Sequence, residues 1–448
     1  MQPLLRRFGD YNLAALGVLA LLFAALGAGG ANSAGAAALL ACALSLCLLI
    51  AAIAAPAGAL DQTLRANGLA ILAALAFIAL ALLSATGPFA VFAPHPRFDE
   101  PALARASLSP YRTLEGVGAF LGPCAAYLLG ALAAPNARAR DQVGRWTMAL
   151  GFLYGMFALY LFFSGAQVGP RLDVAIGSAN AAATVFGMLM VAGAVMATRA
   201  ARGRLSGQAQ TRLPAALTWA RFAYGAPLSL AASFVLFACL LLTASRGGLI
   251  ATLAALAVYA ALLAPQLLKS QRMRQGATAA PVLVMCGALA LMFARGGEDV
   301  LARFALSQAD AEVRATLASA HWSMFLERPL LGHGLNTYHE LNTLAQTPDN
   351  WRALFAAGSA HNIFIQALEE TGLIGLGLLA LMLAVPLARA LMRLIAGGRG
   401  VEWAAGALGL TTLVLLHGLV DFGLQTPAVA ALYAFLIGAA AGRPAGRA

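Results

Sequence analysis

Long apolar runs alternate with short polar connections along almost the whole chain. A helix needs about 20 apolar residues to cross the ~30 Å hydrocarbon core of a bilayer, and the sequence offers twelve runs of about that length. They lie near residues 11–29, 33–55, 68–86, 113–134, 146–165, 178–198, 222–243, 248–267, 278–294, 373–392, 403–420 and 427–441. The pattern predicts an all-α polytopic membrane protein with about twelve transmembrane helices.

The composition agrees with this prediction. Of the 448 residues, 61% are hydrophobic and only 10% are charged, which excludes an ordinary soluble globular protein. The first run follows Arg6 and Arg7 and leads directly into a second, so no cleavable signal peptide is evident. All five cysteines lie within predicted spans without metal-type spacing, which argues against a disulfide or a zinc site.

The basic residues lie mainly on one side of the predicted membrane. With twelve spans both termini share a side, and that side carries nineteen of the 29 Lys and Arg residues but only four of the 18 acids. The positive-inside rule therefore places the termini in the cytoplasm. The net charge of +11 reflects this topology and contact with membrane lipids, and it does not indicate nucleic-acid binding.

Two outer connections are longer than the rest, near 87–112 and 295–372. The second is large enough to form a subdomain between the ninth and tenth spans. We therefore expect three parts: spans one to nine in 1–294, the outer subdomain in 295–372, and spans ten to twelve in 373–448.

The outer subdomain contains two predicted helical pieces. Apolar residues at steps of three and four predict a helix over 310–327, and a short amphipathic piece follows at 349–357. The segment between them includes the turn-forming residues 329–334. We expect the subdomain to lie on the outer membrane interface as a cap.

The segment 361–392 is too long for one transmembrane helix. As a single helix its 32 residues would extend about 48 Å, well beyond the hydrocarbon core. Gly372 stands where a C-terminal glycine would end a short helix, leaving 373–392 to cross the membrane. We therefore expect a helix at 361–371, with Ser359 as its cap, and a break at Gly372.

His361 begins this short helix at the mouth of a membrane span, and Asn362 follows it. The ordinary pKa of histidine lies near neutrality, so a histidine there suits a general base, and Asn362 would orient it or a substrate. A hydrogen-bonded interface histidine without chemistry explains the same position equally well. Ionisable groups close to a membrane are uncommon unless functional, which keeps the catalytic interpretation open.

Two outer arginines are candidates for binding an anion. Arg246 follows Ser245 and precedes Gly247 at the start of a span, where a guanidinium and free helix amides would bind a phosphate. A tight turn with a snorkelling arginine is the alternative, although an arginine used only for topology belongs on the other side. Arg171 lies in another outer loop, where a local pair with Asp173 is an adequate explanation. With a base nearby, two such arginines suit transfer from a diphosphate leaving group.

Four further residues are candidates for substrate binding. Arg314 and His321 are seven residues apart on the predicted outer helix, so they project from one face. Tyr338 is a candidate donor to sugar hydroxyls. Asp421 lies near His417 in an outer hairpin. It could pair with an arginine or share the site, and a structural role is the simplest explanation. No histidine and carboxylate spacing indicates a metal site.

At these residues the sequence resembles the O-antigen ligase (WaaL) family, within the larger O-antigen ligase and polymerase superfamily. The family pattern of His, then Asn, Ser or Gln, nine residues, Gly, two residues and Gly is met by His361, Asn362, Gly372 and Gly375. Ser-Arg-Gly-Gly at 245–248 and Pro-Leu-Leu-Gly-His-Gly at 329–334 also look like superfamily features.

The resemblance implies a periplasmic glycosyltransferase of the bacterial inner membrane. Such an enzyme moves an O-antigen polysaccharide from undecaprenyl diphosphate to a sugar hydroxyl of the lipid A core, in lipopolysaccharide biosynthesis, with no metal and no other cofactor. Carried over residue by residue, His361 matches the family's essential histidine, and Arg246 and Arg171 match its essential periplasmic arginines. The implied mechanism is inverting, with His361 taking the acceptor's proton while the arginines stabilise the departing diphosphate.

Three alternatives stand beside this interpretation. O-antigen polymerases often show an Arg, ten residues, Gly pattern in two outer loops, and here Arg171, Arg246 and Arg314 are each followed by another residue at that position. A protein O-oligosaccharyltransferase would use a histidine and arginines in the same way and would differ only in its acceptor. A lipid-linked glycan transporter would need ionisable residues near the middle of its spans, and the predicted spans contain almost none.

Overall fold

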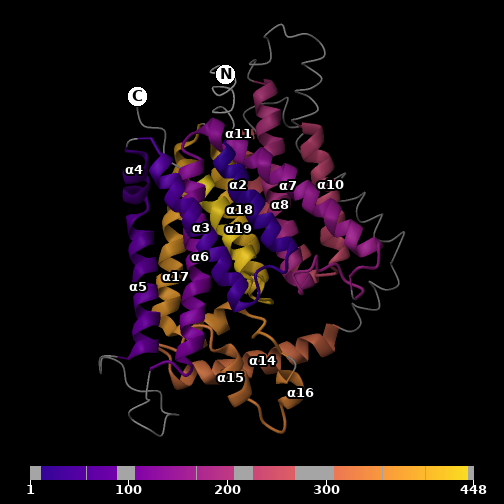
Figure 1. Cartoon of the computed structure of the whole chain (residues 1–448). Helices are drawn as coiled ribbons and strands as arrows, with labels where there is room; N and C mark the ends of the chain where they lie inside the picture. The colour runs from indigo at the N-terminus through magenta and orange to yellow at the C-terminus, as the bar shows by residue number, and fades with distance from the viewer. Residues whose placement is uncertain are drawn as a thin grey trace.

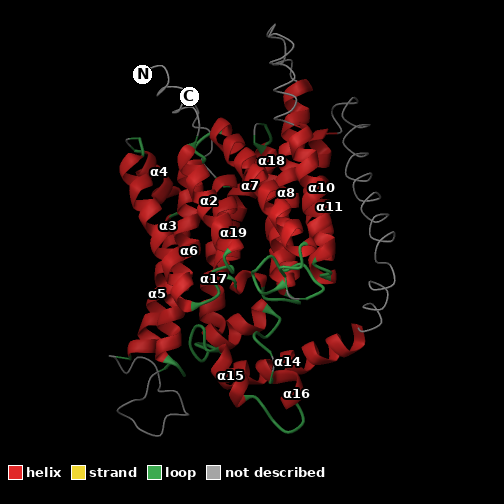
Figure 2. Ribbon diagram, turned by 45° about the vertical axis from the view of Figure 1, so that its right-hand side comes forward, coloured by secondary structure: helices red, strands yellow, loops and turns green. Residues whose placement is uncertain are grey.

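The computed structural model of the chain describes residues 12–56, 58–87, 106–167, 169–205, 226–267, 307–355, 357–398 and 400–441. Within these ranges the secondary structure consists of helices joined by loops, without a strand (Figures 1 and 2). The all-α prediction is confirmed.

Apolar helices run side by side in one bundle (Figure 1). They are α2 (Leu13–Gly27), α3 (Ala34–Ala54), α5 (Gly68–Thr86), α6 (Pro110–Ala133), α7 (Ala137–Phe163), α8 (Ala179–Leu205), α10 (Ala226–Leu242), α11 (Arg246–Leu267), α17 (Ile363–Ala396), α18 (Val401–Gly418) and α19 (Pro427–Ala440). In the described part of the chain, eight helices are long and apolar enough to cross a membrane, as expected of a polytopic membrane protein. Eleven predicted spans coincide with helices of this bundle, and the remaining one, the ninth span at 278–294, lies outside the described residues.

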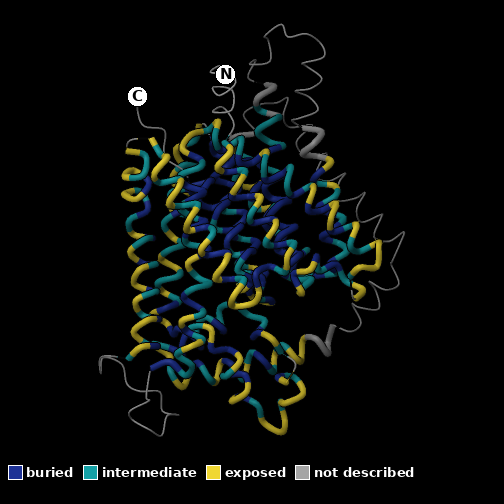
Figure 3. Tube along the Cα trace, in the orientation of Figure 1, coloured by how far each residue is buried: buried dark blue, intermediate teal, exposed yellow. Residues whose placement is uncertain are grey.

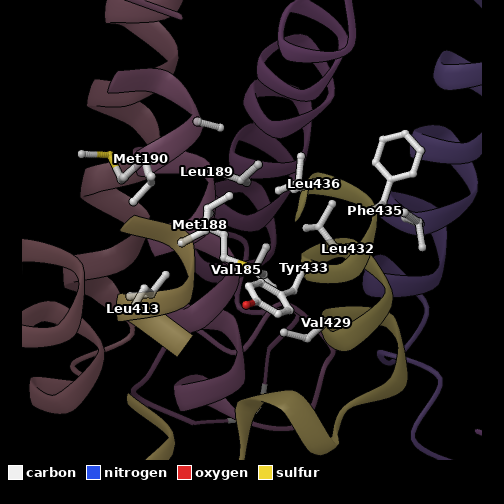
Figure 4. Close-up of a cluster of buried hydrophobic side chains, with 14 of the residues drawn as sticks. Val185, Met188, Leu189, Met190, Leu413, Val429, Leu432, Tyr433, Phe435 and Leu436 are labelled. Carbon is white, nitrogen blue, oxygen red and sulfur yellow. The ribbon is translucent and has the colours of Figure 1, made fainter. Parts of the chain in front are cut away.

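The centre of the bundle is built around α8, whose side chains from residue 181 to 196 are almost all buried (Figure 3). Val185 and Leu189 of α8 belong to one apolar cluster with Leu413 of α18 and Leu432 of α19 (Figure 4). Within the same cluster, Tyr433 keeps its hydroxyl paired with Thr411 at 2.8 Å, because an unpaired hydroxyl is costly away from water. These contacts hold α8, α18 and α19 together.

The helices α6 and α19 cross at two glycines. A Cβ on Gly438 would overlap the carbonyl oxygen of Tyr127, and a Cβ on Gly130 would overlap that of Phe435. Only glycine allows the two backbones to approach this closely, which is how helices pack tightly in a membrane, where dispersion contacts drive association. This crossing fixes the C-terminal helix against the first half of the chain.

Three helices form a cap across one end of the bundle (Figure 1). They are α14 (Ser307–Glu327), α15 (Tyr338–Leu344) and α16 (Trp351–Leu354). Buried Leu317, Ala345 and Leu354 give the cap a small apolar core of its own. The helix predicted over 310–327 is confirmed, whereas the piece predicted at 349–357 is a single turn. Figure 2 shows the loops of the bundle gathering at the end that faces the cap.

Charged side chains pair at the opposite end of the bundle. Arg199 contacts Asp141 and, at 3.2 Å, Glu402, and Arg202 binds Glu402 at 2.8 Å. These residues join the ends of α7, α8 and α18. This is the basic end that the sequence assigns to the cytoplasm, an assignment that stays a prediction.

The helix α17 breaks at Gly372, as the sequence predicts. Gly372 has φ 65° and ψ −173°, which interrupts the helix and frees backbone groups on both sides. The loop 329–334 pairs with these groups through four backbone hydrogen bonds, which we call the backbone seam. The amides of His333 and Gly334 donate to the carbonyl oxygens of Glu369 and Glu370, both at 2.8 Å. In the other direction, the amides of Leu373 and Ile374 donate to the carbonyl oxygens of Pro329 and Leu330, at 2.8 and 3.2 Å.

A short amphipathic helix, α4 (Ala59–Ala66), connects α3 to α5 at the end away from the cap. The cap meets the bundle through α17 and the backbone seam, and Glu340 of α15 also pairs with Arg112 of α6 at 3.3 Å.

Candidate active site

Arg246 is the first residue of α11, and a tight turn holds it. Ser245 accepts the Gly248 amide with its hydroxyl at 3.2 Å and the Leu249 amide with its carbonyl at 3.0 Å, which is the geometry of an N-terminal cap. Ala244, just before, has φ 49°. Arg246 therefore lies at a helix N-terminus, where the backbone amides add to the positive potential of its guanidinium group.

Arg171 is fastened to the same turn from another loop. Its Nε donates to the carbonyl oxygen of Thr243 at 2.9 Å, and its Nη2 donates to Asn180 Oδ1 at 2.7 Å. Asn180 lies at the start of α8. The bond to Thr243 places the guanidinium of Arg171 next to the turn that begins α11.

Asp421 continues this network from the loop after α18. Asn180 donates through its Nδ2 to Asp421 Oδ2, and the Phe422 amide donates to Asp421 Oδ1 at 2.7 Å. Burial by itself raises the pKa of Asp421, but His361, the Phe422 amide and His417 together hold the pKa below its ordinary value. The Asp421 carboxylate is therefore ionised at neutral pH although it is only 1% exposed.

The three predicted arginines meet at one polar cavity of about 70 Å³. It is lined by Arg171, Asn180, Ala244, Ser245, Arg246, Gly247, Arg314, His417, Val420 and Asp421. Arg314 reaches it from α14 of the cap, whereas the other residues belong to the bundle. Three guanidinium groups against one carboxylate make the cavity cationic, which suits an anion such as a phosphate.

His361 faces the same Asp421 oxygen that accepts the hydrogen bond from Asn180. Its Nδ1 is 3.9 Å from Asp421 Oδ2, an ion-pair distance rather than a hydrogen bond, and its ring packs edge-on against Phe422 at 5.3 Å. The Nδ1 atom is buried while the side chain is 27% exposed. The exposed surface therefore belongs to the rest of the ring, the part that a substrate can reach.

Asn362 is the N-cap of α17. Its Oδ1 accepts the amides of Phe364 and Ile365 at 3.0 and 3.1 Å, so α17 begins at Ile363. The expectation that Ser359 would cap this helix is wrong: Ser359 Oγ instead accepts the amide of His361 at 3.4 Å. Asn362 thus fixes the helix start, and with it the direction in which the preceding residue points.

His417 is a buried member of the site, which the sequence placed only near Asp421. Its Nδ1 is 2.8 Å from Thr184 Oγ1 and its Nε2 is 3.5 Å from Ser245 Oγ. Its ring also packs on the backbone of Gly247, where an added Cβ would lie 3.3 Å away. The one sequence signal for Thr184 is its position four residues after Asn180, which puts both on one face of α8.

Two predicted site residues lie elsewhere. His321 and Tyr338 stack on each other in the interior of the cap at 4.8 Å, and they are 0% and 3% exposed. His321 Nδ1 is 2.6 Å from Glu369 Oε2, and burial lowers the pKa of His321 to about 4. The Tyr338 hydroxyl donates to the Ala357 carbonyl at 3.2 Å. The structure does not bring this pair to the cavity.

Among the described residues, no three His, Cys, Asp or Glu side chains cluster as metal ligands do.

Residues 231–380 match the family described as O-antigen ligase. No curated protein matches the chain. The matched segment includes Arg246, Arg314 and His361, and it supports the O-antigen ligase and polymerase superfamily that the sequence resembles. Arg171 and Asp421 lie outside it and are joined to the site by the contacts described above.

Proposed function

We propose that this protein is an O-antigen ligase, which transfers an O-antigen polysaccharide from undecaprenyl diphosphate to a sugar hydroxyl of the lipid A core. One observation carries the proposal: Asp421 lines the cavity that contains three arginines, and its Oδ2 is 3.9 Å from Nδ1 of His361. An anion site next to a base is what transfer from a diphosphate requires. The O-antigen ligase match over 231–380 supports the same chemistry at the level of the superfamily.

In the proposed reaction the acceptor hydroxyl oxygen attacks the anomeric carbon of the donor glycan. The new bond forms as the bond between that carbon and the diphosphate oxygen breaks, and the hydroxyl proton passes to His361. Undecaprenyl diphosphate leaves with the electron pair, and Arg171, Arg246 and Arg314 stabilise its charge. Attack opposite the leaving group inverts the anomeric centre.

Asp421 is assigned the role of orienting His361. Its ionised carboxylate faces Nδ1 of the imidazole at 3.9 Å, so it favours the tautomer that carries the proton on Nδ1 and leaves Nε2 to accept the acceptor's proton. The same carboxylate is hydrogen-bonded by Asn180, which also holds Arg171. The proton acceptor and the anion site are thus joined through one short network.

The proposal places the protein in the bacterial inner membrane, with its termini in the cytoplasm and the cap in the periplasm. The basic end of the bundle, formed by residues such as Arg199 and Arg202, supports this orientation. The partners are then both lipids, the undecaprenyl-linked glycan and the lipid A core, which reach the cavity from the membrane. No metal or nucleotide has a role in the proposed mechanism.

The proposal is tested by transfer with the purified protein in detergent. The assay contains an undecaprenyl-diphosphate-linked glycan, lipid A core as acceptor and EDTA, and the product is followed by gel shift and mass spectrometry. His361→Ala should lower kcat by about 10²–10⁴-fold, the usual contribution of a general base. His339→Ala is the matched control, because His339 is an exposed histidine on α15, and it should retain wild-type activity.

The outcomes separate the alternatives. A glycan that only lengthens on its own carrier would identify a polymerase, and transfer to a peptide would identify a protein O-oligosaccharyltransferase. Transfer that stops with EDTA and returns with a divalent cation would refute the metal-independent mechanism. A folded His361→Ala variant with full activity would refute the assignment of the base.

A further inference from the structure

The backbone at His361 adopts a conformation that a side-chain-bearing residue rarely takes. Its φ is 49°, in the left-handed region, and such a residue persists only where its surroundings hold it. Two hydrogen bonds hold this turn. The His361 amide donates to Ser359 Oγ at 3.4 Å, and the amide of Ala360 donates to Gln366 Oε1 at 3.2 Å.

Gln366 can accept the bond from the Ala360 amide only if its side-chain oxygen, and not its NH₂ group, faces that amide. Its Nε2 donates to Glu370 Oε1 at 3.0 Å, one helical turn further along α17. Glu370 Oε1 is the acceptor of this bond, so the Nε2 end of the Gln366 amide faces Glu370. The oxygen of Gln366 is thereby turned to the Ala360 amide.

Glu370 is itself held by the cap. Its Oε2 accepts the backbone amide of Asn336 at 2.8 Å, in the loop that follows the backbone seam. Gln366 and Glu370 are 9% and 7% exposed, so water competes little for these bonds. A continuous chain of three hydrogen bonds therefore runs from the cap at Asn336, through two side chains of α17, to the residue before His361.

We propose that Gln366 and Glu370 are positioning residues, which hold the His361 ring at Asp421 and couple its position to the docking of the cap. The inference rests on the proposed function, in which His361 is the base. Neither side chain lines the cavity or touches the reacting atoms. They act through the backbone of Ala360 and His361.

The coupling has a specific consequence for catalysis. Without the bond to Gln366, the Ala360 amide is left buried and unpaired, and the turn can relax out of its left-handed form. A displacement of about 1 Å in a catalytic group is enough to lower a rate by about 10²-fold. We therefore expect loss of the chain of bonds to lower kcat by about 10–100-fold, while KM changes by less than about threefold because the arginines are untouched.

The test exchanges the two side chains. Gln366→Glu puts two carboxyl groups side by side, and Glu370→Gln leaves one amide N–H group without an acceptor, so each single variant should lose activity. In the double variant Gln366→Glu with Glu370→Gln, the carboxylate at position 366 accepts the backbone N–H of Ala360 and an N–H of the side-chain amide at position 370. The oxygen of that side-chain amide accepts the backbone N–H of Asn336. The chain of bonds is restored with its order reversed, and kcat should recover to within about threefold of wild type.

A second readout does not depend on turnover. Hydrogen exchange of the peptide that covers 359–366, in the full protein in detergent, should become faster in both single variants and return to the wild-type rate in the double variant. Folded single variants with wild-type exchange and kcat would overturn the proposal, and so would a double variant no better than the worse single variant.

Failure of the proposed function gives a different result. If wild-type protein shows no transfer to lipid A core while exchange follows the expected pattern, the chain of bonds stands and the ligase assignment falls. If His361→Ala transfers normally, a loss of kcat in the single variants would refute the positioning role, because there would be no base to position.

Discussion

Replacing Gly372 with alanine should release the cap from α17. Gly372 has φ 65° and ψ −173°, a region that residues other than glycine occupy at a cost of about 1–3 kcal/mol. An added Cβ would also lie 2.5 Å from the Leu331 nitrogen and overlap the Leu330 carbonyl. These atoms are backbone, so the clash cannot be relieved by a side-chain rotation.

The magnitude follows from what must move. Relief of the clash separates the loop 329–334 from α17 and breaks at least the bonds from Leu373 to Pro329 and from Ile374 to Leu330. Each is worth about 0.5–1.5 kcal/mol net. Added to the strain at Gly372, the expected loss of unfolding free energy is about 2–6 kcal/mol. This should open the cap locally before the bundle unfolds.

The assay combines unfolding in detergent with hydrogen exchange of the amides in the backbone seam. Gly377→Ala is the matched control, because Gly377 lies on the same helix, is exposed, and has nothing within 4 Å of an added Cβ. It should be neutral or stabilise by up to about 1 kcal/mol. Wild-type stability and exchange in Gly372→Ala would refute the seam as the link between the cap and α17.

Two further predictions concern the site and the bundle. Because the pKa of Asp421 is held below its ordinary value, its carboxylate is ionised across the range from about pH 5 to 8. Asp421→Asn should therefore lower kcat by about 10²-fold or more throughout that range. Transfer assayed at both ends of the range checks this, and a loss confined to one end would contradict it. Gly438→Ala should destabilise the protein by about 1–3 kcal/mol, since the new Cβ overlaps the Tyr127 carbonyl. Unfolding in detergent measures it, with Gly17→Ala, where an added Cβ meets nothing within 4 Å, as the control.

The sequence by itself determined the class of the fold and much of its outline. A bilayer leaves a chain few options, because backbone groups must be paired within the segment and each crossing needs about 20 apolar residues. Eleven predicted spans are therefore found as helices. The break at Gly372 was predictable for a related reason: the apolar segment exceeded the membrane thickness, and a glycine stood where it had to end.

The sequence also provided the chemistry in part. His361 with its glycine pattern, and Arg246 at the start of a helix, are local features that a run of residues can reveal. Their local partners were harder to assign, as the capping role of Asn362 in place of Ser359 shows. An N-terminal cap depends on the backbone of the first helical turn, and neighbouring polar residues compete for its amides.

Only the tertiary structure decided which of these residues meet. Asn180 and Asp421 are 241 residues apart in the chain, and they touch because α8 and α18 pack through apolar faces that carry no directional signal in the sequence. The same packing put Arg314 at the cavity and took His321, seven residues away on the same helix, into the core of the cap. Residue type and spacing define what a side chain can do, whereas long-range packing determines what it can reach.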